Sequence, residues 1–118
     1  MECREEFHIC EDRLLEELKK QGSIGWVEGI GLCRQGYTEP YYEVRDYVED
    51  LMKKAGLEVR TDAVGNIFGC WKGTDKDGGI LLTGSHLDSV YGGGIYDGQY
   101  GVFGALEAVR SLKEAGYC

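Results

Sequence analysis

Long apolar runs and basic clusters are both missing from this sequence. No stretch of its 118 residues approaches the roughly 18 consecutive apolar residues that cross a membrane, and the acidic N-terminus lacks the basic and apolar regions of a signal peptide. Acidic residues outnumber lysine and arginine by 21 to 13, a formal net charge of -8, which opposes binding to nucleic acid or anionic lipid. We therefore expect a cytoplasmic protein with neither nucleic acid nor membrane as a partner.

Cysteine pairs are missing as well. The five cysteines are scattered along the chain and none forms a C-x-x-C pair, so neither a disulfide framework nor a zinc knuckle is indicated, and reduced thiols are expected. Hydrophobic residues make up 42% and charged residues 29% of the chain, close to the averages of globular proteins. The length of 118 residues suits a single domain with one core.

The order of helix and strand patterns predicts an α/β fold with a mixed sheet flanked by helices. Amphipathic periodicity indicates three helices, at about residues 5–20, 38–55 and 99–115. Alternating or continuous apolar residues indicate strands at about 57–63 and 67–71, and a further strand that opens the segment ILLTGSHLDSV (80–90). The glycine-rich stretch 21–37 is expected to be an ordered loop, and the acidic pairs Glu5-Glu6 and Glu16-Glu17 are expected on a solvated helix face.

The segment GSHLDSVYGGGIYDGQYG (84–101) contains one of only two histidines, together with two aspartates. Three interpretations compete: a metal site, a phosphate-binding loop, and a turn without chemistry. A P-loop started at Gly93 and Gly98 would need lysine and serine or threonine where Gln99 and Tyr100 stand, and no G-x-G-x-x-G pattern fits. Two aspartates facing a pocket would also oppose an anion, so the phosphate interpretation is disfavoured.

The metal interpretation finds the donors that it needs. His86 is expected at the C-terminal end of a strand, where open α/β sheets bind ligands. Asp88, two residues further along an extended chain, would point to the same side and could accept the hydrogen bond of the other ring nitrogen. Asp97 could return to the same point across the glycine loop. The alternative without chemistry treats His86 as a satisfied polar residue and the aspartates as turn formers, and His8 is expected to be such an exposed histidine.

Two stretches together carry a family resemblance. TGSHLDSVYGGGIYDGQYGVFGALEAVRSLKEAG, preceded by AGLEVRTDAVGNIFG, closely resembles the di-metal amidohydrolases that cleave N-carbamoyl amino acids, allantoate and related ureido compounds, within the zinc-peptidase-like superfamily. The likeness covers about residues 37–116. The short spacing from His86-x-Asp88 to Asp97 is similar to that of the carbamoylase and allantoate branch, whereas related peptidases have a longer insertion there.

The resemblance implies specific roles. His86 would ligate one metal ion and Asp97 would bridge two. Asp88 would contribute to catalysis by orienting His86, without binding the metal itself. The cofactors would be two divalent ions, zinc, manganese or cobalt, which activate water and polarise the ureido carbonyl. The general-base glutamate and the further histidines of the family have no counterpart here. Tyr91-Gly92 stands where the family commonly has Pro-Asn.

Residues 1–118 are therefore expected to form the N-terminal part of a metal-dependent catalytic domain, without the family's lid and dimerisation domain. The complete enzyme is expected to be a homodimer that hydrolyses a C–N bond of a small ureido substrate, and this part alone is expected to be inactive. The alternative is a noncatalytic binding domain that retains the fold.

Overall fold

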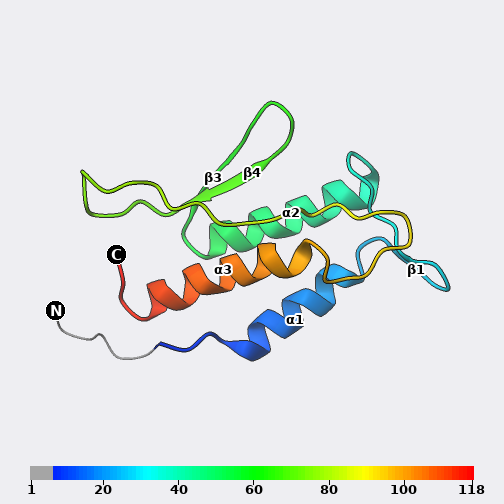
Figure 1. The fold of residues 1–118 in the computed structure, drawn as a ribbon, viewed down its shortest axis with the longest axis horizontal. Helices are drawn as coiled ribbons and strands as arrows, with labels where there is room; N and C mark the ends of the chain where they lie inside the picture. The colour runs from blue at the N-terminus through cyan, green and yellow to red at the C-terminus, as the bar shows by residue number, and fades with distance from the viewer. Residues whose placement is uncertain (1–6) are drawn as a thin grey trace.

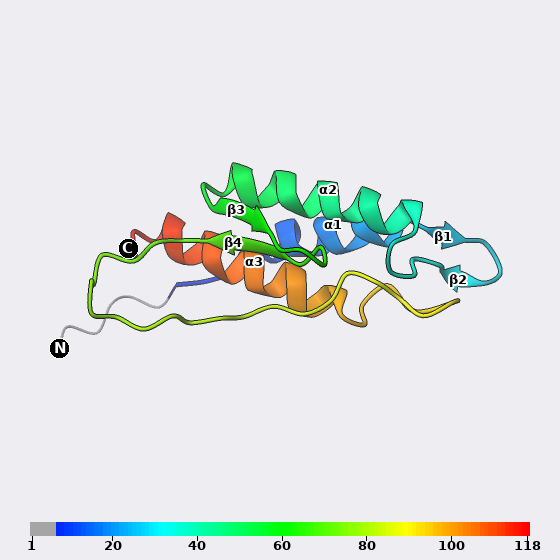
Figure 2. The same cartoon turned by 90° about the horizontal axis from the view of Figure 1, so that it is seen from above.

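The computed structural model describes residues 7–118, which form three helices and two short antiparallel hairpins (Figure 1). The elements in chain order are α1 (Glu11–Gly22), β1 (Trp26–Val27), β2 (Gly31–Leu32), α2 (Glu39–Lys54), β3 (Glu58–Thr61), β4 (Ile67–Cys70) and α3 (Gln99–Glu114). The hairpin β3–β4 lies beside α2, and the hairpin β1–β2 projects from the end of the helical layer (Figures 1 and 2). The expected α/β class is confirmed.

The hydrophobic core lies where the three helices meet. Leu14 and Leu18 of α1, Val48 of α2 and Phe103 of α3 are all buried and form one cluster. Leu14 and Leu18 are four residues apart, so both point from the same face of α1. Leu87, which belongs to no helix or strand, also packs against this cluster. The core therefore anchors the segment that carries His86.

Helices α2 and α3 and the hairpin β3–β4 occur where periodicity predicts them. Pro40 lies in the first turn of α2, where its missing N–H costs nothing. Gly56 follows the helix with a φ of 77°, as expected for a C-terminal glycine. Thr38 occupies the N-cap position, but its hydroxyl donates to the Gln35 carbonyl rather than capping the helix.

Helix α1 begins later than expected. Residues 5 and 6 lie outside the described residues, and Phe7 to Cys10 precede the helix as exposed chain. Cys10 has an extended backbone, and its N–H donates to the Glu107 carboxylate at 2.9 Å, which holds it out of the helix. Glu11 and Asp12 then occupy the first turn, where acidic side chains complement the helix dipole. Exposed His8 agrees with its expected surface position.

Paired charges fill the contact between α1 and α3. Arg110 binds Glu17 through two hydrogen bonds, at 2.6 and 2.5 Å, and Arg13 binds Glu107 through two more, at 2.7 and 2.8 Å. Glu17 and Glu107 are buried. The expectation that the Glu16-Glu17 pair lies on a solvated face is therefore wrong for Glu17, because Arg110 from a distant helix neutralises it.

The stretch 21–37 is not only a loop. It contains the hairpin β1–β2, in which Trp26 pairs with Leu32 and Val27 with Gly31. The turn is closed by the Ile30 N–H, which donates to the Val27 carbonyl at 3.0 Å. Gly29 supplies a φ of 78° within this turn.

The strand expected from residue 80 is not formed. Ile80, Leu81 and Leu82 run through an irregular segment in which the Leu81 side chain is 95% exposed. No described strand lies alongside to pair with their backbone, and both described sheets are antiparallel pairs. The parallel neighbour that a mixed sheet needs is thus not among residues 7–118.

Within the described residues, no helix has the length and apolar content to cross a membrane. The four described cysteines, Cys10, Cys33, Cys70 and Cys118, are free thiols, as expected.

The contrast between the core and the unpaired apolar segment predicts two different mutational effects. Phe103→Ala should lower the free energy of unfolding of this chain by about 3–5 kcal/mol, because it empties the centre of the core. Leu81→Ser should change it by less than about 0.5 kcal/mol, because that side chain already contacts solvent. Urea denaturation followed by circular dichroism measures both. Equal losses would show that Leu81 is buried.

Glu107 should make stability depend on pH. Burial alone would raise its pKa, but hydrogen bonds from Arg13, the Cys10 N–H and Ser111 lower it from 4.5 to about 2. Since the folded pKa lies below the unfolded one, this stabilisation is complete above pH 4.5 and is lost as the pH falls toward 2. We expect a loss of about 2 kcal/mol between pH 5 and pH 3, measured by urea denaturation. Glu107→Gln should lack this part of the pH dependence; an unchanged slope would contradict the assignment.

Candidate metal centre

His86 and Asp88 point to the same side because Leu87 between them packs into the core. Successive side chains of an extended chain alternate in direction, so the partly buried Leu87, which packs against the core, turns its two neighbours outward. His86 Nδ1 lies 2.9 Å from the Asp88 carbonyl oxygen and 3.4 Å from Asp88 Oδ1. A carbonyl oxygen can only accept, so this contact favours the neutral tautomer with hydrogen on Nδ1, which presents a lone pair at Nε2.

Asp97 approaches the other ring nitrogen, Nε2, of the same imidazole. Its Oδ2 lies 3.7 Å from His86 Nε2. Two ligand atoms of one tetrahedral ion, each about 2.0–2.2 Å from it, lie roughly 3.3–3.6 Å apart. The side chain of Asp97 is 88% exposed and those of His86 and Asp88 are about half exposed. The two candidate metal ligands, His86 and Asp97, are therefore open to solvent. The three residues singled out in the sequence are thus brought together.

The glycine loop between Asp88 and Asp97 is held by the hairpin β1–β2. Leu32 and Gly93 form an isolated bridge with N–H to carbonyl distances of 2.8 and 2.9 Å. Gly92 has a φ of 67°, and a Cβ there would lie 3.0 Å from the Ile30 carbonyl oxygen. This supports the expectation that the loop glycines permit a tight path. The next part of the loop is fixed by Gln21, whose Nε2 donates to the Ile95 carbonyl at 2.7 Å.

Gly98 is a site residue that the sequence argument did not assign. It precedes α3 with a φ of 76°, and a Cβ built on it would lie 2.3 Å from His86 Cε1. The imidazole therefore packs directly on the backbone of Gly98. The sequence offered a hint of this role, because Gly98 directly follows the candidate ligand Asp97. Its contact with the His86 ring is visible only in the fold.

Arg34 is a second residue that the sequence argument missed. Its side chain is fully buried, and Nε donates to the Leu87 carbonyl at 2.9 Å. Nη1 and Nη2 bind the Gln21 and Ile24 carbonyls and the Gln21 side chain. Burial lowers the pKa of Arg34 to about 10, against the opposite effect of the nearby Asp88 charge. The guanidinium remains charged at neutral pH and ties the His86 segment to the end of α1.

The donor set fits part of a divalent metal centre. An imidazole nitrogen and a carboxylate oxygen are typical ligands of zinc and related ions, and His86 Nε2 and Asp97 Oδ2 offer this pair. Among residues 7–118, no group of three His, Cys, Asp or Glu side chains is arranged to hold an ion. Further ligands would be needed for a complete hydrolytic centre.

Comparison with known proteins defines the class. Residues 66–117 match Peptidase family M28. A crystal structure of a hydantoinase/carbamoylase family amidase from Burkholderia ambifaria matches with a TM-score of 0.88 and 38% sequence identity, over 93% of this chain and 27% of that one. The fold is thus that of the amidohydrolases and peptidases.

The relatives found by sequence are amidohydrolases and hydrolases of ureido compounds. The chain is 39% identical over 111 residues to ureidoglycolate hydrolase from Oryza sativa subsp. japonica, covering 94% of this chain and 23% of the relative. It is 40% identical over 105 residues to N-carbamoyl-L-amino acid amidohydrolase from Geobacillus stearothermophilus, covering 89% and 26%. The chain is therefore a relative of the hydantoinase/carbamoylase amidohydrolases, which confirms the resemblance, and it spans about a quarter of the length of these relatives.

Gly98 offers a direct test of the site geometry. Gly98→Ala should lower the free energy of unfolding and move the His86 ring, because its Cβ overlaps the imidazole and its φ is unfavourable for alanine. Gly104→Ala is the matched control, since a Cβ at Gly104 in the interior of α3 has nothing within 4 Å and should be neutral or stabilising. Urea denaturation and the His86 ring proton shifts report both effects. If the two variants behaved alike, the contact between Gly98 and His86 would be absent.

Proposed function

We propose that these 118 residues contribute part of the metal centre of an amidohydrolase that cleaves a C–N bond of small ureido compounds. The observation that carries the proposal is the 3.7 Å approach of Asp97 Oδ2 to His86 Nε2, with Nδ1 of the same ring occupied by the Asp88 carbonyl. Relatives named N-carbamoyl-L-amino-acid amidohydrolase and allantoate amidohydrolase support this substrate class. Homodimerisation and a cytoplasmic location of the whole protein remain predictions.

In this proposal each residue has one role. His86 binds a divalent ion through Nε2, and Asp97 binds through its carboxylate, from which it could reach a second ion. Asp88 keeps the hydrogen of His86 on Nδ1, so that Nε2 stays available as a ligand. When bound, zinc, manganese or cobalt ions would supply an activated water and polarise the ureido carbonyl. Exposure of Asp97 leaves room for the further ligands.

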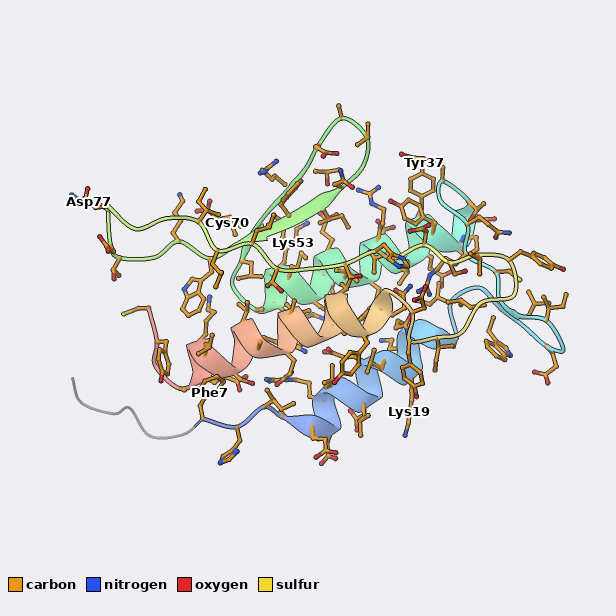
Figure 3. All side chains as sticks on the ribbon, in the orientation of Figure 1. Phe7, Lys19, Tyr37, Lys53, Cys70 and Asp77 are labelled. Atoms are coloured by element: carbon orange, nitrogen blue, oxygen red, sulfur yellow. The ribbon has the colours of Figure 1, made fainter. Side chains whose placement is uncertain are left out.

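Metal binding by this chain should depend on Asp97. Mn²⁺ at low concentration should broaden the NMR signals of His86 and Asp97 before others, because a paramagnetic ion relaxes its nearest nuclei most. Asp97→Asn should raise the Mn²⁺ concentration needed for this broadening by about tenfold or more. Substituting even a residue that only hydrogen-bonds to a metal ligand lowers metal affinity by about this factor. Asp77→Asn is the charge-matched control, because Asp77 lies in the loop after β4 at the far left of Figure 3, whereas the start of α3, which follows Asp97, lies well to the right of that loop (Figure 1). Equal effects of the two variants would contradict a site at Asp97.

Residues 1–118 alone should show no hydrolysis. A di-metal hydrolytic centre needs more ligands than the pair His86 and Asp97, and the described residues supply no group of three. Purified protein incubated with zinc, manganese or cobalt should therefore release neither ammonia nor amino acid from N-carbamoyl amino acids or allantoate. Measurable turnover would show that the residues named here form a complete centre.

A further inference from the structure

The backbone on either side of Asp88 is clamped from two directions. On one side, Arg34 Nε donates to the Leu87 carbonyl at 2.9 Å, and the Arg34 carbonyl accepts the Ser89 N–H at 2.9 Å. The Arg34 N–H also donates to Ser89 Oγ at 3.0 Å. These bonds fix both peptide groups of Asp88, and one of these groups carries the carbonyl that accepts from His86 Nδ1.

Gln99 closes the other side of this clamp. It is fully buried at the start of α3, and its Nε2 lies 3.1 Å from the Leu87 carbonyl, 3.3 Å from the Asp88 carbonyl and 3.2 Å from the Asp97 carbonyl. One amide group thus contacts backbone next to both proposed metal ligands. It links the two ends of the glycine loop.

The burial of Arg34 argues against simple packing as its role. Its guanidinium is out of contact with solvent, and among the described residues no carboxylate lies within ion-pair distance of it. A buried charge of this kind is expensive unless its hydrogen bonds are satisfied. Four hydrogen bonds hold it. One goes to the Gln21 carbonyl at the C-terminal end of α1, whose dipole favours a cation, and one to the Ile24 carbonyl just beyond that helix. The other two go to the Gln21 side chain and to the Leu87 carbonyl. Of these four hydrogen bonds, the one to the Leu87 carbonyl is the one that reaches beyond residues 21–24, and it ends at the residue next to His86.

We propose that Arg34 and Gln99 are positioning residues of the metal centre: together they fix the Asp88 carbonyl so that His86 keeps its hydrogen on Nδ1 and directs the Nε2 lone pair toward Asp97. This inference deepens the proposed function and rests on it for the use of Nε2 as a ligand. Neither side chain contacts the ion itself; both act through backbone carbonyls.

The tautomer of His86 is the direct readout. Ring ¹⁵N shifts at about pH 9, where imidazole is neutral, distinguish hydrogen on Nδ1 from hydrogen on Nε2. In the unsubstituted chain, His86 should be in the Nδ1–H form. Arg34→Lys keeps the charge but replaces the planar fork by a single donor atom, and Gln99→Met removes the donor. Each should lower the ratio of Nδ1–H to Nε2–H by about fivefold, the effect of losing one typical hydrogen bond.

Two controls separate positioning from general loss of stability. Exposed His8 reports the same measurement on a histidine outside the site and should not change. Leu57→Ala removes a buried side chain that packs beside Gly69 of β4, and should lower stability without changing the His86 ratio. If Leu57→Ala shifted the ratio as much as Arg34→Lys, or if neither Arg34→Lys nor Gln99→Met shifted it, the proposal would be overturned.

The test also works if Arg34→Lys does not fold. Gln99→Met then supplies the variant, and the unsubstituted chain should show a scalar coupling across the Arg34 Nε–H to Leu87 carbonyl bond. Absence of this coupling would overturn the role of Arg34. No metal is present in these measurements, so their outcome is independent of the proposed function: a tautomer shift without Mn²⁺ binding would refute the metal centre and leave the clamp in place.

Discussion

The buried guanidinium of Arg34 is the constraint on which the site depends. It joins the end of α1 and the chain just after β2, where Arg34 lies, to the segment around Leu87, which is 53 residues further along the chain. Gln21, which binds Arg34, also binds the Ile95 carbonyl and so extends the same network toward Asp97. Because a buried cation must keep its acceptors, these segments cannot separate without losing several hydrogen bonds at once.

Helix α3 connects this network to a second one at its other end. Near its start, Gly98 and Gln99 contact the His86 ring and the backbone beside it. Two to three turns later, Glu107 and Arg110 bind charged side chains of α1. Helices α1 and α3 therefore contact each other through ion pairs along their length, and at their ends Gln21 and Gln99 position the glycine loop. Rigid elements hold both edges of a loop that has little regular structure of its own.

Local pattern predicted the parts of this molecule whose structure is local. Periodicity located α2, α3 and the hairpin β3–β4, and alternation along an extended chain placed His86 and Asp88 on one side. It failed where the outcome depends on distant partners. Glu17 is buried because Arg110, 93 residues away, pairs with it, and the buried Arg34 side chain binds the Leu87 carbonyl, 53 residues away. The apolar residues from Ile80 indicated a strand, but a strand forms only beside a neighbour. The metal assignment came from the family resemblance together with the spacing of His86 and Asp97.

The central claim is that an imidazole and a carboxylate eleven residues apart bind one cation. Anomalous X-ray diffraction from crystals of this chain grown with Zn²⁺ tests it most directly. The account predicts an anomalous peak about 2.0–2.2 Å from both His86 Nε2 and an Asp97 carboxylate oxygen. A peak on Nδ1 instead, or zinc bound elsewhere with these two atoms left without it, would contradict the claim.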